Sequence, residues 1–155
     1  MIKKGVKIEL SNGVAGFQKS EKGGLDVLTE NGAPINAHIV VLAIGVKPEL
    51  ALANMAGLEI GQRGGIRVNE HMVTSNPDIL AVGDAVEVKD FMTGEYALIP
   101  LAGPANRQGR IAADVIVGRN AKYRGTQGTS ICKLFDAAIA QTGISEKTLK
   151  RRGDT

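Results

Sequence analysis

The segment SNPDILAVGDA, residues 75–85, places a carboxylate, Asp84, directly after a short apolar run and a glycine. A charged group at the end of a buried strand is costly unless something accepts its charge. If this run is a strand of an open α/β sheet, Gly83 and Asp84 lie at its carboxyl end, where such sheets bind ligands. Gly83 then allows close approach, and Asp84 can accept charge-assisted hydrogen bonds from the hydroxyl groups of a sugar-like or ribitol chain. A plain turn capped by Asp84 is an equally good interpretation.

A second candidate feature begins at Pro100, in the sequence PLAGPANRQGR. The first turn of a helix has unpaired N–H groups and a partial positive charge of about half a unit. Pro104 has no N–H, so the backbone donors expected before the helix are those of Leu101, Ala102 and Gly103. Such a helix end stabilises an anionic or electron-rich ligand atom. An ordinary helix start without a ligand explains the same residues.

The helix that follows is expected to run from Pro104 to near Gly118, because apolar residues recur at helical spacing and a glycine ends them. Its apolar face is expected to hold Ile111, Val115 and Ile116. On the remaining surface, Asn106, Arg107 and Arg110 could contact a ligand, although a solvated helix face is the more common place for arginine.

The other elements predict an α/β fold. Alternating apolar residues between turn signals at Asn12–Gly13 and Asn31–Gly32 predict an antiparallel meander near the N-terminus. Its strands are expected at residues 6–10, 14–19 and 25–29. Two continuous apolar runs, residues 37–45 and 78–85, are typical of strands buried on both faces. The remaining expected elements are a helix at 48–56 that ends at Gly57, a loop at 91–97, strands at 129–136 and 137–145, and a helix capped by Ser145.

The composition is typical of a cytoplasmic globular protein. Of the 155 residues, 43% are apolar, only 3% are aromatic and 20 are glycine, which favours α/β layers with many turns. A net charge of +3 indicates neither nucleic-acid nor membrane binding, and no apolar run is long enough to span a bilayer. The single cysteine, Cys132, excludes an intramolecular disulfide and suits a reducing compartment. We expect it to be a small buried apolar residue.

Two segments together carry a family resemblance. TSNPDILAVGDAVEV and, farther on, IPLAGPANRQGRIAADVIVG resemble the second flavin-binding segment of the pyridine nucleotide-disulfide oxidoreductases. Within that superfamily the chain is similar to the branch of coenzyme A-disulfide reductases, NADH oxidases and NADH peroxidases. VVLAIGVKPEL resembles the passage from the NAD domain back to the FAD domain, with Ile44 in place of the usual Thr. GTSICKLFDAAIAQTGIS resembles the opening strands of the C-terminal dimerisation domain.

The resemblance implies partial FAD/NAD(P)-binding Rossmann-like domains with an antiparallel β-meander and the first strands of an α+β dimerisation domain. Residues 1–43 would end the NAD(P)-binding domain, 44–122 would form the second FAD-binding segment and 123–155 would begin the dimerisation domain. Asp84 would hydrogen-bond the FAD ribityl chain, and the segment from Pro100 would lie against the isoalloxazine ring and favour negative charge there. The implied flavin-binding residues are Gly83, Asp84, Pro100, Leu101, Ala102 and Gly103.

Several motifs of the family are missing from the sequence. The family uses two Gly-x-Gly-x-x-Gly motifs, for the FAD and NAD(P) pyrophosphates, and the glycines of GLEIGQRGG are wrongly spaced for either. The redox cysteine of the family belongs to the N-terminal FAD half, whereas Cys132 lies in the dimerisation segment. His38 and His71 are isolated, and no metal-ligand cluster is evident. We therefore expect no catalytic residue, no turnover by the chain alone, and weak or absent FAD binding.

Three functions remain open at this point. The first is the FAD-binding portion of a cytoplasmic, homodimeric oxidoreductase that moves hydride from NADH or NADPH through FAD to a disulfide, persulfide or oxygen species. The second is a non-enzymatic flavin-binding or assembly module. The third is an unrelated Rossmann-like binding protein, in which Asp84 is only a turn residue.

Overall fold

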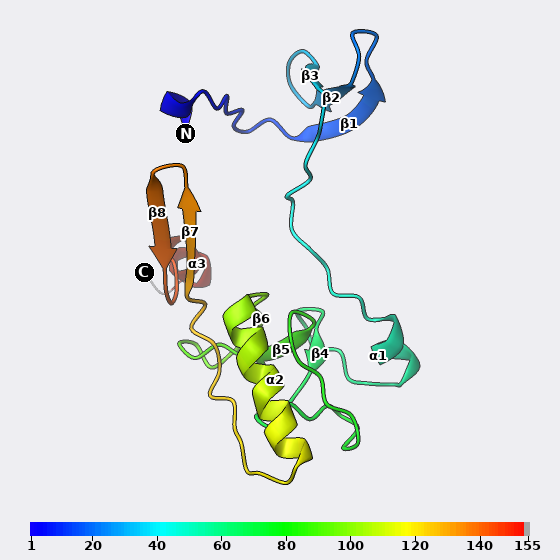
Figure 1. Ribbon diagram of the computed structural model, residues 1–155, viewed down its shortest axis with the longest axis vertical. Coiled ribbons are helices and arrows are strands. Elements are labelled where there is room, and N and C mark those ends of the chain that lie inside the picture. The colour runs from blue at the N-terminus through cyan, green and yellow to red at the C-terminus, as the bar shows by residue number, and fades with distance from the viewer. Residues whose placement is uncertain (154–155) are drawn as a thin grey trace. The chain divides into compact units, whose positions relative to one another are not determined.

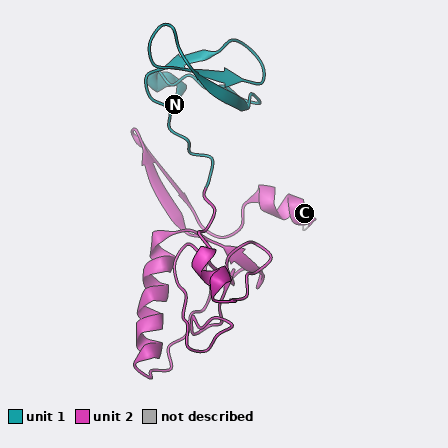
Figure 2. Cartoon of the chain, turned by 90° about the vertical axis from the view of Figure 1, so that its right-hand side faces the viewer, with its two compact units in different colours: residues 1–45 teal, residues 46–155 magenta. Residues whose placement is uncertain are grey.

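A computed structural model describes residues 1–153 of the chain. The chain divides into two compact units, residues 1–45 and residues 46–155, coloured separately in Figure 2. Figure 1 labels the helices and strands of both units. Within the described residues, no helix is both long enough and apolar enough to cross a bilayer.

The first unit contains a three-stranded antiparallel sheet. Its strands are β1 (Val14–Lys19), β2 (Leu25–Thr29) and β3 (Ile35–Ala37), which pair in that order. The sequence predicted β1 and β2 with these bounds, and Gly32 takes a φ of 108° in the turn before β3. The Asn36 amide donates to the Asp26 carboxylate across β2 and β3 at 2.9 Å, and this hydrogen bond lowers the pKa of Asp26.

Two strands expected in this unit are not found in the described residues. Residues 6–10 are irregular and follow a single 3₁₀ turn, η1 (Ile2–Lys4). The Asn12 amide oxygen accepts a hydrogen bond from the Asn31 N–H at 2.9 Å, so Asn12 braces the β2–β3 turn and does not form a hairpin turn of its own. Residues 38–45 are also irregular, and Ile44 is 87% exposed. A strand buried on both faces needs paired neighbours and covering layers, and no described strand pairs with this segment.

The second unit is built around another small sheet. Strands β4 (Ile66–Arg67) and β5 (Val86–Lys89) are parallel, and β6 (Tyr96–Leu98) pairs antiparallel to β5. The strand expected at 78–85 was placed too early, because this segment has only one bridge, between Val73 and Leu80, and the strand begins at Val86. The loop expected at 91–97 already contains the start of β6.

The helices follow their predicted end signals. α1 (Ala51–Met55) begins three residues later than expected, and at its start the Glu49 carboxylate accepts the Ala51 N–H at 2.7 Å. α2 (Ala102–Ile116) is followed by Gly118, with a φ of 81°. α3 (Glu146–Arg152) is capped by the Ser145 hydroxyl, which accepts the Thr148 N–H at 3.3 Å. The end of α2 and the start of α3 confirm the predictions, whereas α2 begins at Ala102, two residues before the predicted start at Pro104.

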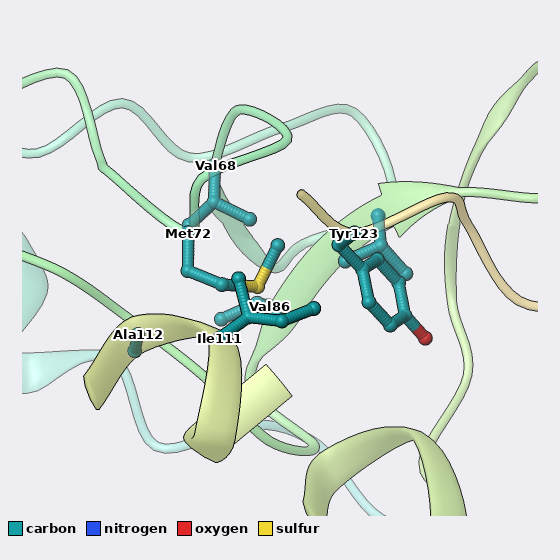
Figure 3. Close-up of a cluster of buried hydrophobic side chains, with 7 residues drawn as sticks. Val68, Met72, Val86, Ile111, Ala112 and Tyr123 are labelled. Carbon is teal, nitrogen blue, oxygen red and sulfur yellow. The ribbon is translucent and has the colours of Figure 1, made fainter. Parts of the chain in front are cut away.

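The core of the second unit lies between α2 and the β4–β5 pair (Figure 3). Its buried members are Val68, Met72, Val86, Val88, Ile111, Ala112 and Tyr123. Val115 packs against this cluster as expected, but Ile116 is 71% exposed, so its placement on the apolar face was wrong.

The loop after β4 is tied to the segment that follows α2. The Tyr123 N–H donates to the Glu70 carbonyl at 2.7 Å, and the His71 ring contacts the Ala121 carbonyl through Nδ1 at 2.7 Å. The Lys122 ammonium hydrogen-bonds the Glu70 carboxylate and lowers its pKa. His71 is therefore not isolated. Its ring contacts the segment that follows α2, next to the core residue Tyr123.

The last strands form a two-stranded hairpin, β7 (Ser130–Leu134) with β8 (Ala137–Gln141). Both lie within the ranges predicted from the sequence. Cys132 is exposed, so the expectation of a buried thiol was wrong. A two-stranded ribbon buries little of either face unless another layer covers it, and the described residues provide no such layer over Cys132.

Candidate functional site

Gly83 and Asp84 form a turn that leads into β5. Gly83 has a φ of 89°, and its carbonyl accepts the Val86 N–H at 3.3 Å. Asp84 therefore lies before a strand and not at the carboxyl end of one, as the sequence had suggested. A side chain at Gly83 would meet no atom within 4 Å, so glycine is needed there for its backbone conformation, and the space beside it is open.

The Asp84 side chain is exposed. Within residues 1–153 it makes no hydrogen bond or ion pair, which leaves its oxygens available to an external donor. An ionised carboxylate is an acceptor only, so the partner that suits it is a set of hydroxyl or N–H groups.

The start of α2 faces the same region. Leu101 precedes the helix in an extended conformation, and no side chain caps the helix end. The Leu101 N–H already donates to the Ile99 carbonyl at 2.9 Å, so it is not the free donor that the sequence predicted. The N–H groups of Ala102 and Gly103 remain as the donors of the first turn. Asn106 turns its amide back to the Ala102 carbonyl at 2.9 Å.

A groove of about 720 Å³ runs between the Gly83–Asp84 turn and α2. The α2 residues along it are mostly small, which leaves space beside the carboxylate. The groove is lined by Val82, Gly83, Asp84, Ala102, Ala105, Asn106, Gly109, Arg110 and Ala113. Of the residues predicted to bind flavin, this groove brings together Gly83, Asp84 and Ala102. Pro100 and Leu101 line a separate cavity of about 750 Å³, and Gly103 lines neither.

Sequence reasoning missed the residue that joins the two sides of the groove. The Gly83 N–H donates to Oε1 of Gln108 at 2.8 Å, and Gln108 is only 2% exposed. The available signal was its spacing, because Gln108 precedes Ile111 and Ala112 by three and four positions on the buried face of α2.

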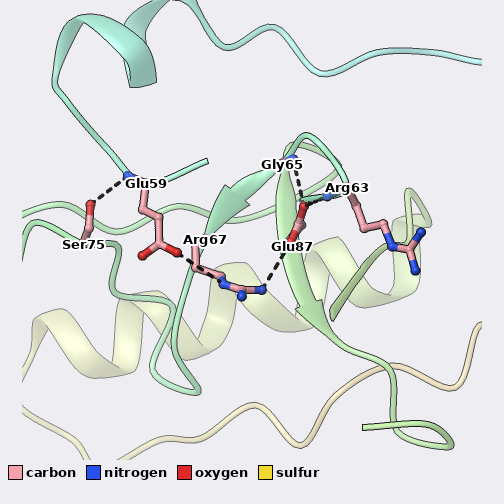
Figure 4. A network of polar contacts seen from close by, with 6 residues as sticks. All are labelled: Glu59, Arg63, Gly65, Arg67, Ser75 and Glu87. Carbon is pink, nitrogen blue, oxygen red and sulfur yellow. Dashed lines mark hydrogen bonds and ion pairs between the residues drawn. The ribbon is translucent and has the colours of Figure 1, made fainter. Parts of the chain in front are cut away.

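A second missed residue is Glu87, which is completely buried in β5 (Figure 4). Its carboxylate accepts the N–H of Arg63 at 2.5 Å and that of Gly65 at 3.3 Å, and it pairs with the Arg67 guanidinium at 3.3 Å. A side chain at Gly61 would approach Glu87 to 2.0 Å. Gly61 and Gly65 of GLEIGQRGG therefore make room for a buried carboxylate, and Gly57 and Gly64 adopt positive φ, which explains these glycines without a nucleotide.

Comparison with known proteins identifies the family. The family described as "Pyridine nucleotide-disulphide oxidoreductase" matches residues 1–109. The chain is 37% identical over 140 residues to the "NAD(P)H sulfur oxidoreductase (CoA-dependent)" of Pyrococcus furiosus, covering 90% of this chain and 30% of that protein. It is 39% identical over 143 residues to the "NADH oxidase" of Methanocaldococcus jannaschii, covering 92% and 31%.

Solved structures agree with this match. The "NAD-Dependent Persulfide Reductase from A. fulgidus" superposes with a TM-score of 0.92 at 38% identity, over 98% of this chain and 28% of that one. Reduced "Bacillus anthracis CoADR-RHD" has a TM-score of 0.84 at 50% identity, over 92% and 25%. This chain thus spans less than a third of the length of these relatives, and the α/β fold class is confirmed. The chain belongs to the pyridine nucleotide-disulphide oxidoreductase family.

Proposed function

We propose that the chain is the FAD-binding portion of a flavoprotein oxidoreductase that transfers hydride from NADH or NADPH to a disulfide, persulfide or oxygen species. The observation that carries this proposal is the groove in which the unpartnered Asp84 carboxylate faces the uncapped start of α2. The relatives support it by their names, which include a CoA-dependent sulfur oxidoreductase and an NADH oxidase. When bound, FAD would supply the hydride-accepting group.

Different residues of the groove would bind the ribityl chain and the ring of FAD. Asp84 would accept hydrogen bonds from the hydroxyl groups of the ribityl chain. The N–H groups of Ala102 and Gly103, with the positive end of the α2 dipole, would stabilise negative charge on the flavin ring. Pro100 and Leu101 immediately precede these donors, and we assign them to packing against the ring.

We also propose the domain assignment implied by the sequence. Residues 1–43 would end the NAD(P)-binding domain, 44–122 would form the second FAD-binding segment, and 123–155 would begin a dimerisation domain. The exposed apolar side chains of Ile131 and Ile139 on the β7–β8 hairpin support homodimer contacts through this last segment.

The same groove is compatible with a non-enzymatic flavin-binding or assembly module. The position of Cys132 favours this second function for the chain by itself, because the thiol lies on the β7–β8 hairpin and not on either side of the groove. We therefore expect no NADH oxidation by the isolated chain.

The proposal is tested by titrating the chain with FAD and following flavin fluorescence. Asp84→Ala should weaken binding about tenfold or more, because it removes a charge-assisted acceptor. Asp78→Ala is the matched control, since Asp78 is also exposed but does not line the groove. Equal FAD affinity in the wild-type chain and Asp84→Ala would contradict the assignment of Asp84.

A further inference from the structure

Gln108 is a buried amide on the inner face of α2. The other buried residues of this helix, Ile111 and Ala112, belong to the apolar core (Figure 3). A leucine or methionine would fill the position of Gln108 without the cost of burying an amide. The amide therefore needs a specific partner, and that partner is the Gly83 N–H, 2.8 Å from Oε1.

Hydrogen bonds hold both the N–H and the carbonyl of Gly83. The Gly83 N–H is held by Gln108, and the Gly83 carbonyl is held by the Val86 N–H at 3.3 Å. Asp84 follows directly, and its carboxylate makes no hydrogen bond or ion pair within the described residues. Its position over the groove is therefore set by the backbone of the turn.

We propose that Gln108 is a positioning residue that holds the Gly83–Asp84 turn against α2. The helix that carries Gln108 also provides the Ala102 side of the groove. One buried side chain thus fixes the distance between the carboxylate and the helix start. The hydrogen bond is part of the fold whether or not flavin binds. Only the expected effect of Gln108 on FAD affinity rests on the proposed function.

Removing the acceptor would leave the Gly83 N–H unpaired next to the core. The turn would then open more often, and the Asp84 carboxylate would spend less time at the position that suits a ribityl chain. FAD affinity would fall although every group that contacts FAD is still present. This separates a positioning residue from a contact residue.

Three variants isolate the hydrogen bond. Gln108→Met keeps an unbranched side chain of similar length and helix propensity but removes the acceptor. Gln108→Glu keeps an acceptor oxygen in the same place. Ile111→Val is the matched control, because it perturbs the same buried face without touching Gly83.

The experiment combines amide hydrogen exchange at Gly83, measured by NMR, with an FAD titration of each variant. Gln108→Met should raise the Gly83 exchange rate and the FAD dissociation constant each by about tenfold, as expected for the loss of one hydrogen bond. Gln108→Glu and Ile111→Val should stay within about threefold of the wild-type chain in both measurements.

Each outcome decides a different claim. Unchanged Gly83 exchange in Gln108→Met would overturn the proposal, as would faster exchange with wild-type FAD affinity. If the wild-type chain binds no FAD, the flavin function fails for this chain, and Gly83 exchange alone still decides whether Gln108 holds the turn. If Gln108→Met does not fold, the wild-type chain decides the claim: exchange at Gly83 as fast as that of an unprotected amide would overturn the proposal, and strong protection of Gly83 would support it.

Discussion

Two carboxylates three positions apart, Asp84 and Glu87, have opposite surroundings. Asp84 lies exposed at a groove without a partner in the described residues, and Glu87 is buried with two backbone donors and one guanidinium. A charge that the fold leaves unpaired is available to a ligand, whereas a buried charge must be paired within the fold. At the scale of single residues, the fold pairs the Glu87 carboxylate and leaves the Asp84 carboxylate free for the flavin contact that we propose.

Glu87→Ala should lower the free energy of unfolding by about 3 kcal/mol, because it leaves the N–H groups of Arg63 and Gly65 without their acceptor. Glu87→Gln keeps one acceptor oxygen and should cost about half as much. Urea unfolding followed by circular dichroism measures both losses. A Glu87→Ala protein as stable as the wild-type chain would show that the loop before β4 does not depend on this carboxylate.

Sequence reasoning at residue scale singled out Asp84 as a candidate and passed over Gln108 and Glu87. A carboxylate after an apolar run stands out because its charge conflicts with its neighbours. The roles of Gln108 and Glu87 depend on partners 25 and 24 positions away in the chain, Gly83 and Arg63 respectively. The residue types around one position do not predict contacts with residues so far away in the chain, so these contacts appear only in the folded molecule.

At the scale of elements, those with local end signals were predicted well. α2 ends near Gly118 and α3 begins after the Ser145 cap, as predicted, and the β1–β2 and β7–β8 strand pairs lie within their predicted ranges. The two continuous apolar runs, residues 37–45 and 78–85, were wrongly expected to be strands. Whether such a run becomes a strand depends on neighbours across the sheet, which the run itself does not specify.

The β7–β8 hairpin gives a direct prediction at this scale. Cys132 is exposed on a ribbon without a covering layer, so it should react with a thiol reagent in the folded chain about as fast as in urea. The reaction is followed by the absorbance of the released thiolate at low protein concentration. Strong protection in the folded monomer would mean that another segment covers the hairpin. Protection that grows with protein concentration would instead support dimer contacts at β7–β8.

At the scale of the whole molecule, the chain divides into two units, and the groove that we propose as the flavin site lies in the second. The family match covers residues 1–109, which include the first unit and the Gly83–Asp84 turn. The segments of the sequence together indicate the family, although each segment alone is weak evidence for it.

The most direct test of this account is to map FAD binding by NMR on the ¹⁵N-labelled chain at high FAD concentration. We predict weak, saturable shifts concentrated at the amides of Gly83, Asp84, Ala102 and Gly103, and their loss in Asp84→Ala. Saturable shifts located elsewhere, with these four amides unmoved, would contradict the claim that the groove between the Gly83–Asp84 turn and α2 binds flavin.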